Sequence, residues 1–529
     1  MTGNLLEVRD LDILIRGRKL VDSVSFALAP GETVALIGES GSGKSMTASA
    51  IMGLLPPGIT MAARSAIVFD GKPLDPADEA AMRPLRGRDI SVVFQDPMSC
   101  LNPFMTAGAQ IDEALRRLGH GDGSKRQARI LDLLQLVEMS DPAIIASRYP
   151  HELSGGQQQR VMTAMALAAE PKLLIADEPT SALDATVQAE ILALLTRLQD
   201  RLGNAMLFIT HDLAAASQLA DQIVVMHKGR CVEQGPTAEV LRSPKDPYTR
   251  MLVSTRSMLA ELPAAAPRSS SEPLLAISGL QYDYPAKRLF SKPFRAVDDI
   301  SITLAPGETL GILGESGSGK STLAKLIIGL ARPGGGDIAL FGESLAARNF
   351  RLTSAMRKRC QIIFQNPYGA LNPRLTIETA MREPLELLGL SGPDDHAKLG
   401  SALADVNLTP DYLGRYPHQL SGGQRQRVCI ARALLSEPSL LICDEIVSAL
   451  DATVQMQVLR TLKALQQKRG FAMLFIGHDI EIVRWISDRI AVMHRGKVVE
   501  QGEAGALVKH PVEAYTRKLV AAMPRPIAS

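Results

Sequence analysis

The sequence has few cysteines and no surplus of charge of either sign. Lys and Arg number 58 and Asp and Glu number 56, so the formal net charge of +2 does not indicate nucleic acid as a partner. The cysteines are scattered, without a Cys-x-x-Cys pair, which argues against a zinc site or an iron–sulfur cluster. Reduced, partly buried thiols of a cytosolic protein are the simplest interpretation. The five cysteines are Cys100, Cys231, Cys360, Cys429 and Cys443.

Long hydrophobic runs are also missing. No uninterrupted apolar stretch approaches the roughly 18 residues that a membrane-spanning helix needs. The first ten residues do not contain a basic region followed by an apolar core, so we expect no signal peptide. A chain of this kind would need separate subunits for any work in a membrane.

One glycine-rich loop occurs twice, each time between an apolar run and a segment of helix formers. The first copy follows residues 33–37 and the second follows residues 309–313, and we expect both runs to be buried strands. A strand, a glycine-rich loop ending in Gly-Lys-Ser and a helix form the context of a phosphate-binding P-loop. The copies comprise Gly38, Glu39, Ser40, Gly41, Ser42, Gly43, Lys44 and Ser45, and Gly314, Glu315, Ser316, Gly317, Ser318, Gly319, Lys320 and Ser321.

In such a loop, successive backbone N–H groups and the positive end of the helix bind phosphate oxygens. Lys44 and Lys320 are expected to reach the β- and γ-phosphates, and Ser45 and Ser321 to ligate Mg²⁺. A glycine-rich turn without a ligand is the alternative for one copy. The repetition in matching contexts favours nucleotide binding at both.

The remaining motifs recur in the same order after the second loop, which indicates a tandem duplication. We expect a first domain over 1–259, a linker over 260–273 that is rich in Ala, Pro and Ser, and a second domain over 274–529. Alternating strands and helices predict an α/β fold in each half, with a largely parallel, helix-covered sheet. Ligands are expected at the carboxyl ends of its strands.

A pair of carboxylates ends one apolar strand in each half. Asp177 and Asp444 are placed to hold Mg²⁺ through water beside the P-loop serine. Glu178 and Glu445, which follow them, are suited to orient and polarise the water that attacks the γ-phosphate.

A histidine ends another strand in each half. His211 and His478 could contact the γ-phosphate and help to position the attacking water. One strand-end histidine is as often an ordinary core residue, but its recurrence at the same place favours a function.

The sequence Leu-Ser-Gly-Gly-Gln opens a helix in each half and supplies a second anion-binding element, with a hydroxyl, free N–H groups and glycines that permit close approach. The P-loop of the same half already occupies the phosphate. This element is therefore expected to face the nucleotide of the other half through Ser154 and Gly156, or through Ser421 and Gly423.

Together, these motifs resemble the nucleotide-binding domains of ABC transporters over nearly the whole chain, twice. Walker A, Q-loop, Leu-Ser-Gly-Gly-Gln signature, Walker B with its glutamate, Ser-Ala-Leu-Asp loop and switch histidine occur in order. The resemblance implies two P-loop NTPase domains, each with a RecA-like α/β core, an antiparallel β subdomain and a helical signature subdomain. It also implies that the two domains close head to tail around two ATP molecules, with Asp184 and Asp451 signalling across the interface.

The same resemblance implies the composition of each ATP site. The first site would combine Lys44, Ser45, Gln95, Asp177, Glu178 and His211 with Ser421 and Gly423. The second would combine Lys320, Ser321, Gln365, Asp444, Glu445 and His478 with Ser154 and Gly156. The family places an aromatic ring under the adenine, for which the second half has Tyr284 and the first half has Ile15.

Finer features resemble the ATPases of dipeptide and oligopeptide importers. These are the sequences around Gln95 and Gln365, each ending in Leu-Asn-Pro, and the tail motifs Asp246-Pro247-Tyr248-Thr249 and Glu513-Ala514-Tyr515-Thr516. Fusion of two ATPases in one chain resembles the microcin-C-type and glutathione-type peptide importers. The resemblance implies a peripheral subunit at the cytoplasmic face of the inner membrane that works with two permease subunits and a solute-binding protein. The segments 98–150 and 368–416 would contact the permeases.

Two other functions stay open at this point. A soluble two-ATPase factor acting on ribosomes is one, although such proteins usually carry a long, charged helical linker where this chain has a short one. Import of nickel, glutathione or another small solute in place of peptides is the other. The residues of this chain do not distinguish these solutes, because the solute contacts the binding protein and the permeases.

Overall fold

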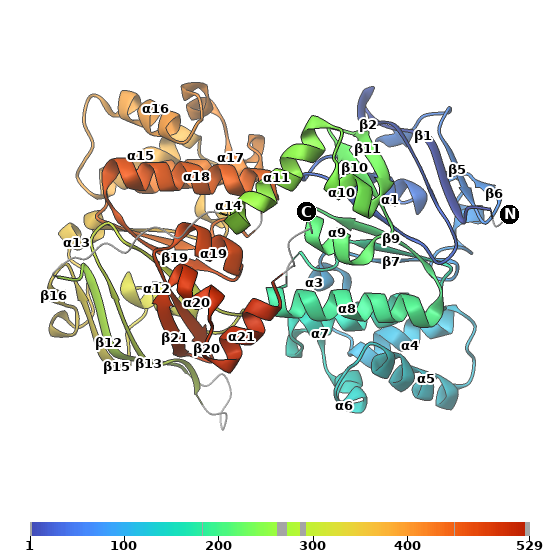
Figure 1. Ribbon diagram of the computed structural model, residues 1–529, viewed down its shortest axis with the longest axis horizontal. Helices are drawn as coiled ribbons and strands as arrows, with labels where there is room; N and C mark the ends of the chain where they lie inside the picture. Colours follow the sequence, from blue (N-terminus) through green and yellow to red (C-terminus); the bar gives the residue numbers. More distant parts are fainter. Residues whose placement is uncertain (1–2, 182, 262–271, 286–292, 449, 524–529) are drawn as a thin grey trace. The chain divides into compact units, whose positions relative to one another are not determined.

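The computed structural model describes residues 3–181, 183–261, 272–285, 293–448 and 450–523. Two compact units divide between Ser257 and Met258. Each unit contains a six-stranded sheet, a smaller antiparallel sheet and a similar series of helices (Figure 1). The α/β duplication predicted from the sequence is therefore confirmed, and each unit is described below by itself.

The core of the first unit is a six-stranded sheet in the order β11-β10-β3-β9-β8-β7. Its strands are parallel except at the β11 edge, where β11 pairs antiparallel with β10. Both central strands, β3 and β9, are buried along their whole length, as strands covered on both faces must be. The strands are β3 (Thr33–Ile37), β7 (Ile90–Val93), β8 (Leu173–Asp177), β9 (Ala205–Thr210), β10 (Gln222–His227) and β11 (Arg230–Pro236).

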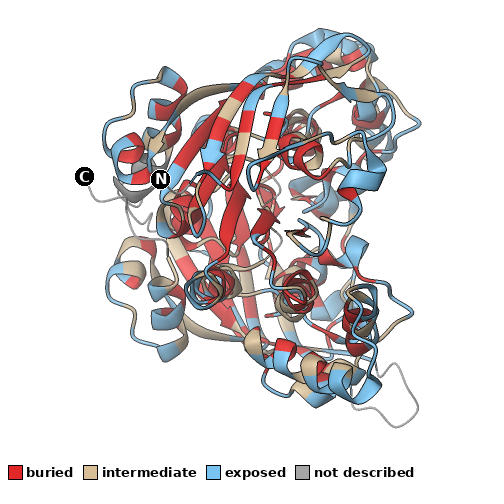
Figure 2. Ribbon diagram, turned by 90° about the vertical axis from the view of Figure 1, so that its right-hand side faces the viewer, coloured by how far each residue is buried: buried red, intermediate tan, exposed pale blue. Residues whose placement is uncertain are grey.

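The second unit repeats this sheet in the order β17-β18-β19-β14-β20-β21, with β21 antiparallel to β20. Its central strands, β14 and β19, are buried along their whole length. Figure 2 shows the same for the first unit, which faces the viewer there and whose central strands are largely buried. The strands of the second unit's sheet are β14 (Thr309–Leu313), β17 (Cys360–Ile363), β18 (Leu440–Asp444), β19 (Ala472–Gly477), β20 (Arg489–His494) and β21 (Lys497–Glu503).

An antiparallel sheet packs against each core sheet. In the first unit its order is β2-β1-β5-β6, and β4 also pairs with β1. One buried cluster joins Leu6 and Val24 of this sheet to Leu36 and Ile209 of the core sheet, so a hydrophobic layer holds the two together. The strands are β1 (Leu6–Ile15), β2 (Arg18–Leu28), β4 (Ile59–Met61), β5 (Ala66–Phe69) and β6 (Lys72–Leu74); in the second unit, β12 (Leu275–Tyr284), β13 (Phe294–Leu304), β15 (Gly335–Leu340) and β16 (Glu343–Ser344).

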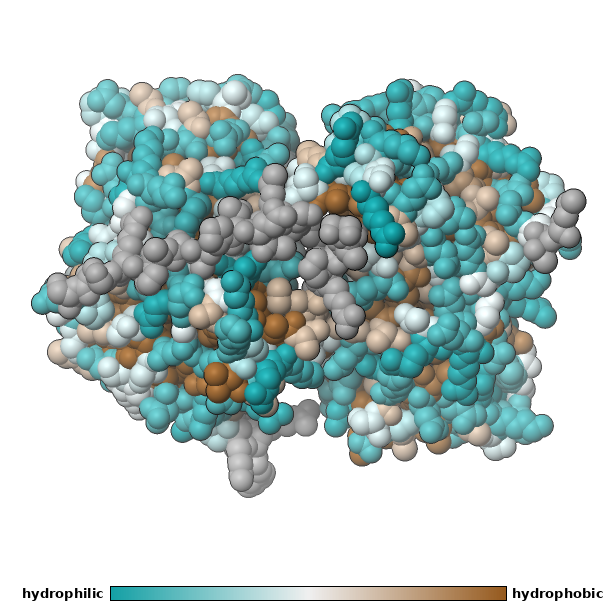
Figure 3. Space-filling view, in the orientation of Figure 1, coloured by the Kyte–Doolittle hydropathy of each residue, from teal (hydrophilic) through white to brown (hydrophobic). Residues whose placement is uncertain are grey.

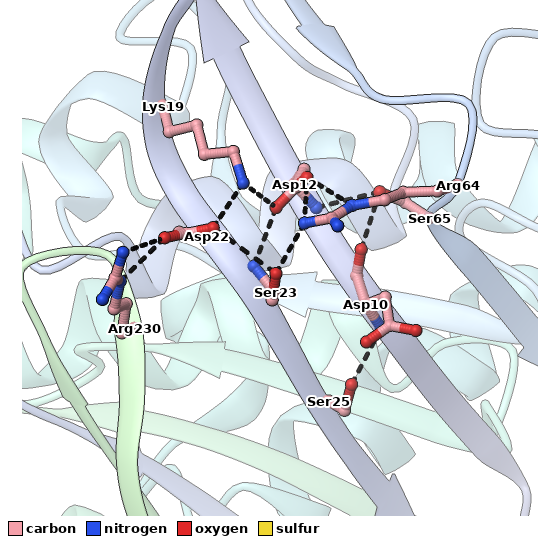
Figure 4. Close-up of polar contacts among 9 residues, drawn as sticks. All are labelled: Asp10, Asp12, Lys19, Asp22, Ser23, Ser25, Arg64, Ser65 and Arg230. Carbon is pink, nitrogen blue, oxygen red and sulfur yellow. Dashed lines mark hydrogen bonds and ion pairs between the residues drawn. The ribbon is translucent and has the colours of Figure 1, made fainter.

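A polar network fastens the first antiparallel sheet to the core sheet (Figure 4). The buried carboxylate of Asp12 accepts hydrogen bonds from Arg64 Nε at 2.7 Å and Lys19 Nζ at 3.2 Å. Asp22 on β2 binds Lys19 and also Arg230 Nε of β11, at 2.7 Å. The hydrogen bonds from Lys19 and Arg230 lower the pKa of Asp22 to about 2, so the carboxylate stays ionised in this network.

The chain segment that connects β7 to β8 forms a separate layer of helices. The segment that connects β17 to β18 forms the corresponding layer in the second unit. Side-chain caps begin several of these helices, such as Thr106 for α4 and Ser154 for α7. The helices are α3 (Pro97–Cys100), α4 (Ala107–Arg117), α5 (Gly123–Leu136), α6 (Pro142–Ser147) and α7 (Gly155–Ala166); in the second unit, α14 (Pro367–Ala370), α15 (Ile377–Leu387), α16 (Asp395–Asp405) and α17 (Gly422–Leu434).

The predicted linker lies only partly within the described residues. Helix α11 (Pro247–Glu261) includes the first two residues of the expected linker, 260 and 261, and residues 262–271 lie outside the described part of the chain. Within the described ranges, no helix combines the length and the apolarity that crossing a membrane requires. The face of the molecule in Figure 3 is largely hydrophilic, with hydrophobic residues in small groups.

Candidate functional site

Each P-loop connects the buried central strand of a core sheet to a short helix, α1 (Lys44–Ile51) or α12 (Lys320–Ile327). Gly43, the N-cap of α1, has a φ of 102°, a conformation that favours glycine. A Cβ at Gly38 would lie 2.1 Å from the carbonyl oxygen of Met226, so no side chain fits there. The backbone of β10 thus approaches the loop closely and fixes its shape.

The P-loop lysine lies inside its own loop. Lys44 is 4% exposed, and its Nζ donates hydrogen bonds to the carbonyl oxygens of Gly38 at 2.8 Å and Glu39 at 3.0 Å. It also lies 3.8 Å from Glu178 Oε1. The loop therefore holds a buried positive charge, as a site for an anionic phosphate requires, and the Glu178 carboxylate beside it partly balances that charge.

The P-loop serine meets the first carboxylate of β8. Ser45 Oγ donates a hydrogen bond to Asp177 Oδ1 at 3.0 Å. A hydroxyl and a carboxylate are the oxygen donors that Mg²⁺ takes, and Mg²⁺ is usually held by few protein ligands together with substrate phosphates. Among the described residues, no group of three or more His, Cys, Asp or Glu could hold a metal ion by itself. Ser45 and Asp177 therefore fit a magnesium ion that arrives with a nucleotide.

Glu178 is the centre of the polar contacts at this edge of the sheet. Gln95 Nε2 donates a hydrogen bond to Glu178 Oε2 at 2.9 Å, and His211 Nδ1 lies 3.4 Å from the same oxygen. The backbone φ of Glu178 is 46°, in the left-handed region, which costs a non-glycine residue about 1–3 kcal/mol. Its N–H group donates to the carbonyl of Ile209 on β9 at 2.9 Å, and this bond helps to hold the strained residue in place.

The second half repeats the arrangement with nearly the same distances. Lys320 Nζ donates to the carbonyl oxygens of Gly314 at 2.7 Å and Glu315 at 2.9 Å, and lies 3.5 Å from Glu445. The φ of Glu445 is 49°, so the strain recurs as well. The other contacts are Ser321 Oγ to Asp444 Oδ1 (3.0 Å), Gln365 Nε2 to Glu445 Oε2 (2.9 Å) and His478 Nδ1 to Glu445 Oε2 (3.5 Å).

The pKa values of the two adjacent carboxylates, Asp177 and Glu178, are shifted in opposite directions. Burial acts to raise the pKa of Glu178, but the hydrogen bond and charge of His211 and the charge of Lys44 outweigh it and lower the pKa. Burial raises the pKa of Asp177, against the hydrogen bond from Ser45. Burial acts to lower the pKa of His211, yet the hydrogen bond and charge of Glu178 raise it overall. The directions are the same for Glu445, Asp444 and His478.

The two halves differ at the end of the first strand. Tyr284 ends β12, and its hydroxyl lies 3.2 Å from Thr322 Oγ1 on α12. Ile15 ends β1 at the corresponding place, and Met46 follows the P-loop Lys-Ser pair where the second half has Thr322. Both members of the Tyr–Thr pair are thus replaced in the first half. The family resemblance pointed only to Tyr284, and the contact in the structure adds Thr322 to it.

The Leu-Ser-Gly-Gly-Gln serines begin helices α7 and α17. Ser154 Oγ accepts a hydrogen bond from the N–H of Gln157 at 3.3 Å, and Ser421 Oγ accepts one from Gln424 at the same distance. Gly156 is needed for packing, because a Cβ there would lie 2.5 Å from Val187 Cγ1; for Gly423 the distance to Val454 Cγ1 is 2.3 Å. Local structure therefore explains the second glycine of this motif without a ligand.

Two aspartates expected to signal between the halves also have local partners. Asp184 caps α8 (Ala185–Leu202) by accepting a hydrogen bond from the N–H of Val187, and Asp451 caps α18 (Ala452–Arg469) in the same way.

Sequence reasoning gave no role to the tail tyrosines, Tyr248 and Tyr515. Their hydroxyls accept hydrogen bonds from P-loop N–H groups, and their recurrence in both tails was the signal for them.

Comparison with known proteins agrees with this geometry. The model of the family described as "ABC transporter" matches residues 21–181 and 297–448, and that of "Oligopeptide/dipeptide transporter, C-terminal region" matches residues 232–272 and 499–529.

The chain is 44% identical to the Peptidoglycan transport ATP-binding protein YejF of Agrobacterium fabrum (strain C58 / ATCC 33970), over 98% of this chain and 96% of that protein. It is 40% identical to the Glutathione import ATP-binding protein GsiA of Escherichia coli (strain K12), over 99% of this chain and 90% of that protein. The solved structure of cbiO1 from Clostridium perfringens is 26% identical, with 48% of this chain and 97% of that chain aligned and a TM-score of 0.40. The chain therefore belongs to the ABC transporter family and carries two copies of its ATPase domain.

Proposed function

We propose that this ABC ATPase energises the import of dipeptides or oligopeptides through separate membrane permease subunits. The observation that carries the proposal is that the same polar contacts surround Glu178 and Glu445, in a chain whose two tails both match the oligopeptide/dipeptide transporter C-terminal region. Relatives named for peptidoglycan transport and for glutathione import take peptide-containing solutes, which supports a peptide over a metal ion or a sugar. The proposed place of action is the cytoplasmic face of the inner membrane.

In each half, the residues of the chain divide the work on ATP between them. Lys44 and the P-loop N–H groups would bind the phosphates, and Glu178, kept ionised by His211 and Lys44, would accept a proton from the attacking water. Gln95 would hold the glutamate in place through the bond seen in the structure. Mg²⁺, held by Ser45 and Asp177, would neutralise charge on the phosphates.

We further propose that each ATP is completed by the opposite half. Ser421 and Gly423 would face the nucleotide on the first P-loop, and Ser154 and Gly156 that on the second. The support is that each of these serines begins a helix whose first turn contains two glycines, and a helix N-terminus is a ready site for phosphate. A short crosslinker between Ser154→Cys and Ser316→Cys, which replaces an exposed serine of the second P-loop, tests this arrangement. Crosslinking should increase when ATP is trapped, and an unchanged yield would refute the arrangement.

The permeases are the proposed partners of the helical layers over residues 98–150 and 368–416. These layers expose large apolar side chains, of which Phe104 is 87% exposed and Tyr368 64% exposed. Arg374 occupies the position in the second half that Phe104 has in the first, so the two contact surfaces differ in charge. Two different permease subunits and a solute-binding protein would complete the importer.

The experiment that tests the function is ATP hydrolysis by the complete transporter in liposomes. Peptides presented with the solute-binding protein should raise the rate several-fold above the rate without solute. Nickel and a sugar are the controls, and stimulation by either of these without stimulation by peptides would refute the proposed solute. Stimulation by glutathione alone would restrict the solute to that one tripeptide. Peptide-dependent uptake should be absent when either permease is omitted.

A further inference from the structure

The tail helix of each half contacts the P-loop of the same half. Tyr248, near the start of α11, lies 209 residues after Glu39 in the sequence, and its hydroxyl accepts a hydrogen bond from the Glu39 N–H at 3.0 Å. The carbonyl oxygen of the same residue, Glu39, accepts the 3.0 Å hydrogen bond from Lys44 Nζ. One P-loop residue is thus bound on one side by the tail and on the other by the phosphate-binding lysine.

Two sets of contacts fix the position of the Tyr248 ring, one made by the ring itself and one made by the backbone of the tail. It packs on the His227 ring, with 4.0 Å between the ring centroids, at the end of β10. The tail itself is anchored to β11, because the Glu233 carboxylate accepts hydrogen bonds from the N–H groups of Lys245 at 2.8 Å and Asp246 at 3.0 Å. Tyr248 is 8% exposed, so its hydroxyl is held at the loop by a rigid surround.

The second half contains the same device, built from corresponding residues. Tyr515 on α21 (Ala514–Ala521) accepts a hydrogen bond from the Glu315 N–H at 3.2 Å and stacks on His494, with 3.9 Å between centroids. Glu500 on β21 accepts from the N–H groups of Val512 at 3.0 Å and Glu513 at 3.1 Å. The Glu315 carbonyl again accepts from Lys320 Nζ, at 2.9 Å.

We propose that Tyr248 and Tyr515 are positioning residues for ATP: each hydroxyl sets the P-loop conformation that directs the lysine and the loop N–H groups to the phosphates. The tail that distinguishes this group of ATPases thereby acts on nucleotide affinity from within the same half. The inference depends on ATP binding at the P-loops and is independent of the imported solute, so its outcome is separate from that of the transport proposal.

Hydrogen exchange of the full chain tests the contact directly. In Tyr248→Phe the ring can still stack on His227, but the Glu39 N–H loses its acceptor. Peptides covering residues 33–46 should then exchange faster than in the unmodified chain, because a broken hydrogen bond lowers protection. Ser254→Ala is the matched control, since it removes an exposed hydroxyl of the same helix, which donates a hydrogen bond to the Met251 carbonyl oxygen at 3.0 Å and lies away from the P-loop contact. Its P-loop exchange should be unchanged.

Nucleotide affinity tests the consequence. With the second P-loop disabled by Lys320→Ala, Tyr248→Phe should raise the Kd of a fluorescent ATP analogue roughly two- to tenfold, the value of one hydrogen bond. Tyr515→Phe should do the same in a Lys44→Ala chain. In Tyr248→Phe and Tyr515→Phe chains that keep both P-loop lysines, the turnover number at saturating ATP should change by a smaller factor than the KM for ATP. Unchanged Kd in both tyrosine variants, or an equal rise in the Ser254→Ala control, would overturn the proposal.

Discussion

The two halves should bind ATP with different strength, because only one offers an aromatic ring to the adenine. In the second half the Tyr284 side chain, 38% exposed, ends β12, and its hydroxyl contacts Thr322 at 3.2 Å. In the first half Ile15 and Met46 occupy the two positions. Stacking of a base on an aromatic side chain contributes about 1–3 kcal/mol, which corresponds to a ratio of roughly 5 to 150 in Kd.

Site-isolated chains allow this ratio to be measured. Lys44→Ala leaves the second site and Lys320→Ala leaves the first, and the Kd of ATP in each is obtained by equilibrium titration without Mg²⁺ to prevent turnover. The first site should be the weaker. In the Lys44→Ala chain, Tyr284→Ile should raise the Kd by the same factor of roughly 5 to 150.

The reverse exchange is the matched gain-of-function variant. Ile15→Tyr together with Met46→Thr, in the Lys320→Ala chain, should tighten binding at the first site toward that of the second. GTP serves as a control for stacking in general, because any purine gains from the ring. Equal affinities of the two isolated sites, with no effect of Tyr284→Ile, would refute the reasoning.

Three further predictions concern catalysis, pH and packing. Glu178→Gln with Glu445→Gln should lower the turnover number at least 100-fold and leave the Kd of ATP within about twofold, since an amide keeps the shape but cannot accept the proton; undiminished hydrolysis would refute the assignment. His211 and His478 have raised pKa values, so their stabilising contribution is complete below about pH 6.5, the ordinary value, and is lost as the pH rises through the raised pKa. Urea unfolding should therefore show a stability loss above neutral pH that His211→Gln with His478→Gln removes, and an identical pH profile in the variant would contradict it. Gly156→Ala should lower the free energy of unfolding by about 1–3 kcal/mol, because its Cβ would lie 2.5 Å from Val187 Cγ1. Gly155→Ala is the control and should cost less, because its Cβ would lie 3.5 Å from Leu183 Cδ2. Val187→Ala should restore part of the stability lost in Gly156→Ala, and equal losses in Gly155→Ala and Gly156→Ala would show that packing is not the cause.

The duplication, the α/β sheets and the grouping of the candidate site residues were predictable, because each depends on short motifs that can be recognised one at a time in the sequence. A P-loop needs eight consecutive residues, and Asp177 and Glu178 must lie at the carboxyl end of β8 once that strand is recognised. Parallel strands bring their carboxyl ends to one edge, so the meeting of Lys44, Gln95 and Glu178 followed from the order of the motifs.

Other features depend on backbone conformation or on contacts over long distances in the chain. The positive φ of Glu178 is not encoded in the residue type, since glutamate ordinarily avoids that region. Ile446 in the second half stands where the first half has Pro179, whose ring restricts the backbone φ. The structure shows the same turn in both halves, with Ser181 N–H to Glu178 O and Ser448 N–H to Glu445 O both at 3.3 Å. The bond between Tyr248 and Glu39 was equally invisible, because no local pattern pairs a tail with a loop.

The presence of both ATPase domains in one chain has a consequence for how the pair of domains is assembled. Ile15 and Met46 in one half and Tyr284 and Thr322 in the other belong to a single gene product. Two separate polypeptides would mix into pairs of identical partners as well as mixed ones, in proportions set by their expression. Translation of one chain always produces one half with Ile15 and Met46 and one half with Tyr284 and Thr322. The difference between the two halves is therefore present in every molecule, whatever the level of expression.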